Sequence, residues 1–271
     1  MLTNMKEELL KAYKNNKAIP QFNINNLEWT KFILEECEKE NYPVILGVSE
    51  GAIEYMGGYS TVVNLVKSLI EELKITIPVS IHLDHGSSIE SCVKAINTGF
   101  TSVMIDLSKE ELNNNINQTK QLVELARPNI LVESEVGPIG TSIGTKKYTD
   151  VESCKKLIET KIDLLAPAIG NKHGIYDGQA ELDYNLLNEI NKLNIPLVLH
   201  GASGLPDEDI KKCIKLGIAK VNFNTDLQLA WAKDIRKYIN ENDDVYDPRK
   251  IIKSGEQAIK SKILEKLELL K

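Results

Sequence analysis

The chain has 271 residues, of which 42% are apolar, so it can bury the core of one large α/β domain or of two small ones. Its 33 basic and 39 acidic residues leave a net charge of −6, which argues against a nucleic-acid partner. Without a signal-peptide segment or an apolar run long enough to cross a membrane, the sequence predicts a cytoplasmic protein with no membrane partner. The four cysteines are widely spaced, which predicts reduced thiols and no structural zinc site.

Apolar runs rich in valine, isoleucine and leucine alternate eight times with helix-like runs. Such runs are typical of parallel strands that helices cover. The predicted strands are 18–25, 43–49, 78–85, 102–108, 130–137, 164–170, 196–203 and 220–226. Eight such units predict a closed (β/α)₈ TIM barrel in a single domain, residues 1–271. An open, doubly wound sheet is the alternative, and the absence of a GxGxxG motif after the first strand disfavours it.

Amphipathic segments between the strands predict helices over residues 29–40, 61–73 and 227–240. An extra C-terminal helix is predicted over residues 255–270. Its apolar positions with helical spacing are Ile259, Ile263, Leu264, Leu267 and Leu270. We expect this last helix to pack on the barrel or on another subunit.

Three of the four histidines stand where predicted strands end, namely His85, His173 and His200. In a barrel the carboxyl ends of all strands meet at one face, so three strands can direct three imidazoles to one point. Three imidazoles with one position left open form the ligand set of a catalytic zinc ion. A glycine follows each histidine and lets a ligand approach the backbone closely. The pattern favours a metal site over three unrelated polar residues.

Asp84 directly precedes His85. Adjacent residues on a strand face opposite sides, so both can serve one site only if the strand ends there. A carboxylate beside a metal ligand acts as a general acid or base, or it anchors the ligand. We interpret His82, the fourth histidine, as a structural residue that could bond to Asp84, with a ligand role as the alternative.

Glu133 and Glu135 alternate with other residues in the fifth predicted strand, so they share one face. Because buried, unpaired carboxylates are costly, that face should meet a cation, basic groups or water. Asp106, which ends the fourth strand, is a neighbour of this face across the barrel. Two interpretations stay open, a hydrogen-bonded core network and a second cation position.

The sequences HGASG and NFNTD end the last two predicted strands. Barrel enzymes often bind phosphate there, on glycine amides, hydroxyls and a helix N-terminus. Suitable donors are Gly201, Ala202, Ser203, Asn222, Asn224 and Thr225. Ser203 and Thr225 could each be a simple helix cap. Their occurrence together favours a phosphate site.

A set of motifs runs nearly from end to end of the chain. They are QFNINNLEWT, PVILGVSEGA, YMGG, IHLDHGSS, GFTSVMID, NKHG, PLVLHGASGLPD, KVNFNTD and YDPRK. In these motifs the chain resembles the class II, metal-dependent ketose-bisphosphate aldolases, above all fructose-1,6-bisphosphate aldolase. The family fold is a (β/α)₈ barrel, which agrees with the periodicity.

The resemblance implies that His85, His173 and His200 hold a catalytic Zn²⁺ and that Asp84 is the catalytic aspartate. The acidic positions that it implies for a second divalent ion are Asp106 and Glu135. It also implies a monovalent cation at the phosphate site.

The resemblance further implies a substrate site for a phosphorylated ketose. The positions are Asn23, Ser49, Gly174, Gly201, Ala202, Ser203, Asn222, Phe223, Asn224 and Thr225. Arg249 is implied to reach a substrate phosphate from the neighbouring subunit, which predicts a homodimer or homotetramer.

Two departures from the family pattern bear on catalysis. Family members carry a longer, acidic loop after strand five with a glutamate that moves a proton at the reacting carbon, whereas residues 137–150 contain no glutamate. We expect a strand-borne carboxylate, Glu133, or a metal-side water to substitute, with Tyr148 and Lys146 as further candidates. The second departure is Asp177, where the family usually has a lysine.

The expected reaction is the zinc-dependent, reversible cleavage of fructose 1,6-bisphosphate to dihydroxyacetone phosphate and glyceraldehyde 3-phosphate in glycolysis and gluconeogenesis. Zinc would polarise the C2 carbonyl and Asp84 would take the proton of the C4 hydroxyl. The alternatives are the same reaction on tagatose 1,6-bisphosphate, the C4 epimer, and a catalytically impaired aldolase-like binding protein. Retention of all three histidines and Asp84 argues against the binding protein. A zinc hydrolase fits poorly, because the substrate site is built for two phosphates.

Overall fold

Eight parallel strands close into a barrel in the computed structural model, which describes residues 2–126, 128–137, 139, 148–174, 176, 178 and 180–271. The strands are β1 (Ile19–Asn23), β2 (Val44–Ser49), β3 (Val79–Gly86), β4 (Ser102–Ile105), β5 (Leu131–Val136), β6 (Leu164–Pro167), β7 (Leu197–Leu199) and β8 (Ile218–Phe223). They follow one another in chain order, and β8 pairs with β1. The predicted (β/α)₈ barrel is therefore confirmed, and the open sheet is excluded.

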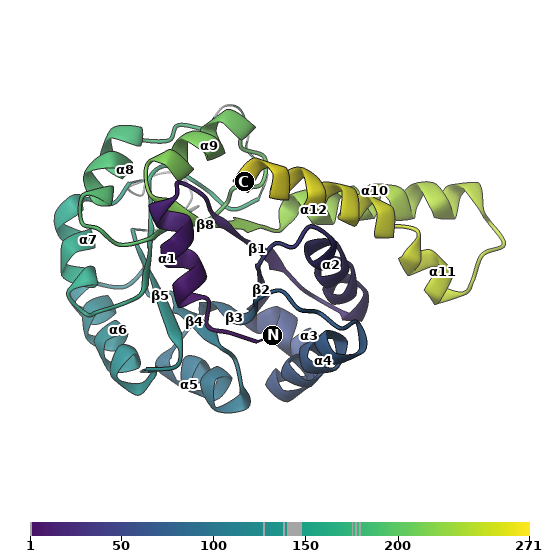
Figure 1. The fold of residues 1–271 in the computed structure, drawn as a ribbon, viewed down its shortest axis with the longest axis horizontal. Helices are drawn as coiled ribbons and strands as arrows, with labels where there is room; N and C mark the ends of the chain where they lie inside the picture. The colour runs from purple at the N-terminus through teal and green to yellow at the C-terminus, as the bar shows by residue number, and fades with distance from the viewer. Residues whose placement is uncertain are drawn as a thin grey trace.

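The described helices lie outside the barrel (Figure 1). They are α1 (Lys6–Lys14), α2 (Leu27–Lys39), α3 (Glu50–Tyr55), α4 (Tyr59–Glu72), α5 (Ile89–Thr98), α6 (Leu112–Ala126), α7 (Val151–Ile158), α8 (Tyr184–Asn191), α9 (Asp207–Lys215), α10 (Thr225–Glu241), α11 (Pro248–Lys253) and α12 (Glu256–Leu270). Most of them lie around the barrel, whereas α1 lies across one end and α11 lies farther out. In the part of the chain that the structure describes, none of these helices combines the length and the apolar character needed to cross a bilayer.

Strand side chains are buried on both faces, as expected for parallel strands between a filled barrel and a helical layer. The main apolar core lies between the strands and the surrounding helices. The four cysteines are buried and unpaired, so the prediction of free thiols is confirmed.

The first helix, α1, closes the amino-terminal end of the barrel. Met5 and Leu9 are buried in one cluster with Ile19, Ile45 and Leu131, which stand at the starts of their strands. Figure 1 shows α1 lying across the barrel. The opposite, carboxyl end is the open one.

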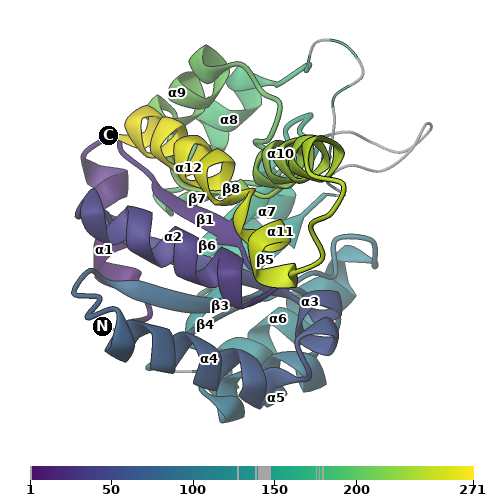
Figure 2. The ribbon, with the colours of Figure 1, turned by 90° about the vertical axis from the view of Figure 1, so that its right-hand side faces the viewer.

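Helices α10, α11 and α12 form an arm that projects sideways from the barrel in Figure 1 and points toward the viewer in Figure 2. In this arm α12 packs along α10, and it also contacts α2, α9 and β1. The predicted packing of the last helix on the barrel is therefore confirmed.

Several predicted strands run past their observed carboxyl ends. The observed strands β4, β6 and β7 end at Ile105, Pro167 and Leu199. Apolar and small residues such as Leu107, Ile169 and Ala202 still occur beyond these points, although the backbone has already turned into the loops that carry the site. Periodicity also missed α3, a short helix capped by the side chain of Ser49.

An irregularity in β3 sets the direction of two side chains. Leu83 pairs with Val103 and Gly86 with Ile105, so Asp84 and His85 together oppose a single residue of β4. His85 has a φ of 53°, in the left-handed region that few non-glycine residues adopt. A β-bulge of this kind re-aims side chains. Asp84 and His85 can therefore both face the cavity, although β3 continues to Gly86 and does not end where we expected.

Candidate active site

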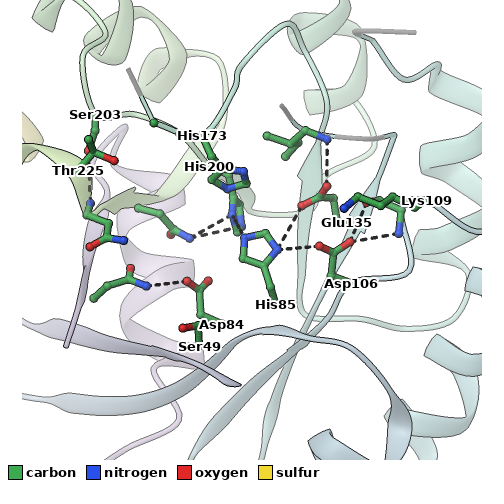
Figure 3. Close-up of a pocket in the computed structure, with 17 residues that line it drawn as sticks. Ser49, Asp84, His85, Asp106, Lys109, Glu135, His173, His200, Ser203 and Thr225 are labelled. Atoms are coloured by element: carbon green, nitrogen blue, oxygen red, sulfur yellow. Dashed lines mark hydrogen bonds and ion pairs between the residues drawn. The ribbon is translucent and has the colours of Figure 1, made fainter. Parts of the chain in front are cut away.

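A cavity of about 420 Å³ opens at the carboxyl ends of the strands (Figure 3). The predicted site residues that line it are Asn23, Ser49, Asp84, His85, Asp106, Glu135, His173, Gly174, His200, Gly201, Ser203, Asn222, Asn224 and Thr225. Ala202 and Phe223 are fully buried instead, and the Phe223 ring stacks on Phe22 in the core. These two can offer a substrate only backbone atoms.

The imidazoles of His85, His173 and His200 converge in the middle of the cavity (Figure 3). The centroid of the His85 ring lies 4.9 Å from that of His173 and 4.8 Å from that of His200. One ring nitrogen from each residue lies within 4.8 Å of the others. Three separate strand ends thus bring three imidazole nitrogens together, and their role as metal ligands stays a prediction.

A carboxylate holds the outer nitrogen of two of these rings. Asp106 Oδ2 lies 2.7 Å from Nδ1 of His85, and Glu133 Oε1 lies 2.8 Å from Nε2 of His200. The remaining nitrogens, Nε2 of His85 and Nδ1 of His200, face each other at 3.1 Å. In many metal sites a carboxylate bonds one ring nitrogen of a histidine, and the other ring nitrogen faces the metal position. The arrangement here is of this kind.

The charges around His85 favour a positive charge at this point. Burial lowers the pKa of His85, but Asp84, Asp106 and Glu135 outweigh it and raise the pKa to about 9. Two imidazole nitrogens that face each other at 3.1 Å need a proton or a cation between them. The donor set and its electrostatic surroundings therefore fit a zinc ion.

A second group of possible ligands lies on the far side of His85. It consists of His85, Asp106 and Glu135. Glu135 accepts a hydrogen bond from the backbone of Ile139 through Oε1, while its buried Oε2 has no hydrogen-bond partner among the described residues. Burial, with a smaller contribution from Asp106, raises the pKa of Glu135 to about 8. Oε2 of Glu135, which lies 3.9 Å from Nδ1 of His85, is the oxygen that a second cation would use.

One carboxylate oxygen of Asp84 accepts a hydrogen bond from a side chain, and the other does not. Its Oδ2 accepts a 2.8 Å hydrogen bond from Nδ2 of Asn23, whereas the buried Oδ1 has no partner among the described residues. Burial raises the pKa of this carboxyl, but His85, His200 and Lys220 outweigh it and hold the pKa below its usual range. Asp84, which lines the cavity, is thus an ionised carboxylate with one oxygen left without a hydrogen bond among the described residues.

Glu133 and Glu135 differ although they share a face of β5. Glu133 is fully buried, with one oxygen bonded to His200 and the other 2.7 Å from Nζ of Lys220. Glu133 therefore belongs to a hydrogen-bonded core network, whereas a second cation position at Glu135 stays a prediction. Since both oxygens of Glu133 are engaged, the geometry counts against our hypothesis that it replaces the missing loop glutamate.

His82 is fully buried and takes no place in the histidine cluster. Its Nδ1 faces the neighbouring strand β4 and lies 2.6 Å from the hydroxyl of Ser102, so the bond to Asp84 that we considered is replaced by one to Ser102. Burial, reinforced by Lys220, lowers the pKa of His82 to about 3, so the ring is neutral. A structural role, the interpretation that we preferred, fits this position.

The proposed phosphate region lies opposite the acidic group. Figure 3 shows Ser203 and Thr225 on one side of the histidines, with Asp106 and Glu135 on the other. The Ser203 hydroxyl accepts bonds from the backbone N–H groups of Asn224 and Asp226, both at 3.3 Å. Ser203 thus does cap α10, and it also lines the cavity beside the N-terminus of this helix.

Two asparagines and a glycine complete this region. The side-chain oxygens of Asn222 and Asn224 are buried without a hydrogen-bond partner in the described part of the chain. Gly201 has a φ of 65°, and a Cβ there would lie 2.1 Å from the carbonyl oxygen of Lys172. Only glycine fits this close approach between the two loops, which brings backbone and polar atoms to the cavity.

Arg249 lies away from the cavity. It stands on α11 in the arm, its side chain is 89% exposed, and it pairs with Asp247 at 2.8 Å. Tyr148 donates its hydroxyl to the backbone of Glu181 and does not line the cavity. Lys146, Asp177 and most of residues 137–150 lie outside the described residues.

Sequence reasoning missed three residues that line the cavity, namely Ser108, Lys109 and Ile139. Ser108 donates its hydroxyl to Asp106 at 2.7 Å and so holds that carboxylate. Lys109 is the next residue in the chain. The signal for Ser108 and Lys109 was their place after the fourth observed strand, and the signal for Ile139 was its place after the fifth, where barrel loops carry function.

Fold and site together define a (β/α)₈-barrel protein with a candidate metal centre at the carboxyl end of the barrel. The family model for fructose-bisphosphate aldolase class-II matches residues 3–271. The chain belongs to the class II fructose-bisphosphate aldolase family, whose members are metal-dependent aldolases. The family predicted from the sequence is confirmed.

Individual relatives agree with this membership. The chain is 49% identical to the fructose-bisphosphate aldolase of Geobacillus stearothermophilus, over 98% of this chain and 96% of the relative. It is 47% identical to that of Staphylococcus aureus, with the same coverage. Among solved structures, the YdjI aldolase of Escherichia coli K12 superposes with a TM-score of 0.87 at 33% identity, covering 100% of this chain and 97% of that one.

Proposed function

We propose that the protein is a zinc-dependent aldolase that reversibly cleaves fructose 1,6-bisphosphate into dihydroxyacetone phosphate and glyceraldehyde 3-phosphate. The observation that carries the proposal is the convergence of three imidazoles beside the free carboxylate oxygen of Asp84 in one cavity. The names of relatives that are 47% and 49% identical support the choice of substrate.

The three histidines His85, His173 and His200 would hold the catalytic zinc ion. Imidazole nitrogens are common zinc ligands, and a set of three leaves a position open for substrate. The bound ion would act as a Lewis acid that polarises the carbonyl group of the ketose. Asp106 and Glu135 are proposed to hold a second divalent ion.

Asp84 is proposed as the group that moves the proton of the C4 hydroxyl. It takes the proton during cleavage and returns it during condensation. A low pKa keeps the carboxyl ionised at neutral pH, so Asp84 is ready to accept the proton. Asn23 fixes one oxygen, and the other has no hydrogen-bond partner among the described residues.

The loops after β7 and β8 are proposed to bind one phosphate of the ketose. The N-terminus of α10, a helix of 17 residues, offers backbone N–H groups and a positive dipole end. Gly201, Ser203 and Thr225 surround this end, and a monovalent cation is proposed beside them.

Arg249 is proposed to bind the second phosphate in the site of a neighbouring subunit. Its exposed position on the arm, away from the cavity of its own chain, supports this role. The proposal therefore includes a homodimer or homotetramer.

We also propose that residues 1–271 act as one domain in the cytoplasm. Four free, buried cysteines support a reducing compartment, in which thiols stay unpaired.

Metal removal tests the proposed function. Incubation with a chelator should abolish cleavage, and Zn²⁺ should restore it. Borohydride added with substrate should leave the protein unlabelled, because the carbonyl is activated without a Schiff base. Among the described residues Lys109 is the one lysine that lines the cavity. Covalent trapping on Lys109 or on any other lysine would contradict the proposal.

The same assay separates the alternatives when fructose and tagatose 1,6-bisphosphate are compared side by side. Faster cleavage of the fructose compound supports the proposal, and faster cleavage of its epimer moves the assignment to a tagatose-bisphosphate aldolase. A zinc-loaded protein that binds both compounds and cleaves neither would be an impaired, aldolase-like binding protein.

A further inference from the structure

Lys220 and Glu133 form a buried ion pair next to the histidine cluster. Nζ of Lys220 lies 2.7 Å from Oε2 of Glu133, and Oε1 of Glu133 lies 2.8 Å from Nε2 of His200. The side chains of Lys220 and Glu133 are 0% exposed, and that of His200 is 1% exposed. The three residues come from β8, from β5 and from the position after β7, so the closed barrel brings them together.

This chain of contacts selects one form of the His200 ring. An ionised carboxylate only accepts hydrogen bonds, so Nε2 of His200 carries the ring hydrogen. The lone pair of the neutral ring is then on Nδ1, the nitrogen that lies 3.1 Å from Nε2 of His85. Glu133 thus turns the metal-binding nitrogen of His200 toward the other candidate ligands.

Glu133 depends in turn on Lys220. A carboxylate that is buried without a cation is costly, and removal of one partner of a buried pair destabilises the other. The other neighbour is His82, whose Nε2 lies 3.7 Å from Glu133 Oε2 while its Nδ1 is engaged with Ser102. Within the described part of the chain, Lys220 is the one lysine or arginine that pairs with Glu133.

We propose that Lys220 is a positioning residue for the metal centre. It holds Glu133 in place, and Glu133 fixes the orientation and the tautomer of the His200 ring. The inference rests on the metal site of the proposed function. Outer carboxylates orient metal-binding histidines in many proteins. In this chain a buried lysine in turn holds the carboxylate.

The variant Lys220→Met tests the inference, because it removes the ammonium group and keeps a long side chain. We expect the dissociation constant for Zn²⁺, measured by competition with a chelator, to rise about 10–100-fold, as for other lost partners of metal ligands. Lys266→Met is the matched control. Lys266 is also buried and pairs with Asp226 at 3.0 Å, and its described ion pairs involve no histidine. Its loss should leave the zinc affinity unchanged.

A double variant keeps the test decisive if Lys220→Met does not fold. Glu133→Met combined with Lys220→Met removes both charges, and apolar replacement of a whole buried pair is often neutral for stability. This variant should fold and still bind zinc 10–100-fold more weakly, by the same reasoning. In the metal-free protein, ¹⁵N spectra of the histidine rings should show that His200 no longer keeps its hydrogen on Nε2.

Two different results would contradict the metal site and the role of Lys220 separately. A wild-type protein that binds no zinc would contradict the metal site of the proposed function. A wild-type protein that binds zinc, with equal affinity and the same His200 tautomer in the double variant, would overturn the inference alone. Lys220 would then be an ion-pair partner in the core and nothing more.

Discussion

Three carboxylates around the histidines differ because their neighbours differ. Asp84 has cationic neighbours and a low pKa, and one of its oxygens is free. Glu133 has both oxygens engaged by Lys220 and His200. Glu135 lies near another carboxylate in a buried place, and its pKa is raised to about 8. These surroundings suit a base, an anchor and a cation ligand, respectively.

Replacement of Asp84 by alanine should lower kcat by about 10²–10⁴-fold, the usual effect of a lost general acid or base. Asp84→Asn should show a similar loss, since the amide keeps the shape but cannot accept the proton. Zinc content, measured by atomic absorption, should stay near the wild-type value, because His85 and not Asp84 is the proposed ligand. A variant that lost its zinc would show Asp84 to be a ligand or an anchor.

His82 should make the metal-free protein less stable in acid. Its pKa is about 3 in the folded protein, against an ordinary value of 6.5, so the unfolded chain binds the proton more readily. The contribution is therefore fully present above pH 6.5 and is lost as the pH falls toward 3, with a slope of about 1.4 kcal/mol per pH unit. Urea unfolding of the wild type and of His82→Gln at several pH values measures it. Parallel curves for the two proteins would rule this contribution out.

The positions of the three histidines could be predicted from the sequence, because strand ends in a barrel meet at one face whatever the details of the loops. The roles of Glu133 and Glu135 could not be separated in this way. Alternation along a strand gives the face of a side chain and does not give its depth in the barrel. The partner of Glu133, Lys220, is 87 positions away in the chain and becomes a neighbour only on closure.

At the level of elements, the loops after β6 and β7 hold each other in place. Gly201 lies so close to the backbone of Lys172 and His173 that a side chain at 201 would collide with it. One loop carries His173 and the other follows His200. The contact between the two backbones therefore helps to set the distance between two candidate metal ligands.

Gly201→Ala should weaken both stability and zinc binding. The new Cβ collides with Lys172, and the φ of 65° is unfavourable for alanine. We expect a loss of about 1–3 kcal/mol in urea unfolding and a weaker affinity for zinc, because His173 is displaced. Gly51→Ala is the control. It lies in α3, where an added Cβ meets no atom within 4 Å, so it should be neutral or slightly stabilising. Equal behaviour of the two variants would disprove this account.

The kind and order of the strands could be predicted, and the fine geometry of β3 could not. Apolar runs mark buried strands, since they report burial on both faces. The bulge at Asp84 and His85 leaves no mark in hydrophobic periodicity, because both residues are polar. A non-glycine residue in the left-handed region, His85, is visible only in the folded backbone.

At the scale of the whole molecule, the arm should take part in assembly. Arg249→Ala should raise KM for the bisphosphate, on the order of tenfold, while kcat changes less, because the guanidinium would bind a phosphate and take no part in bond cleavage. Lys253→Ala, an exposed change on the same helix, is the control. Analytical ultracentrifugation should show a dimer or tetramer. A monomeric wild-type protein whose KM is insensitive to Arg249→Ala would contradict a shared site.

Because α1 closes one end of the barrel, it also limits where ligands can enter and leave. Met5 and Leu9 fill the amino-terminal end with apolar side chains, so no path leads through the barrel axis. Among the described residues the cavity opens at the carboxyl ends of the strands, so we expect substrate to enter and both products to leave there. A compound bound at this opening would therefore block cleavage and condensation alike.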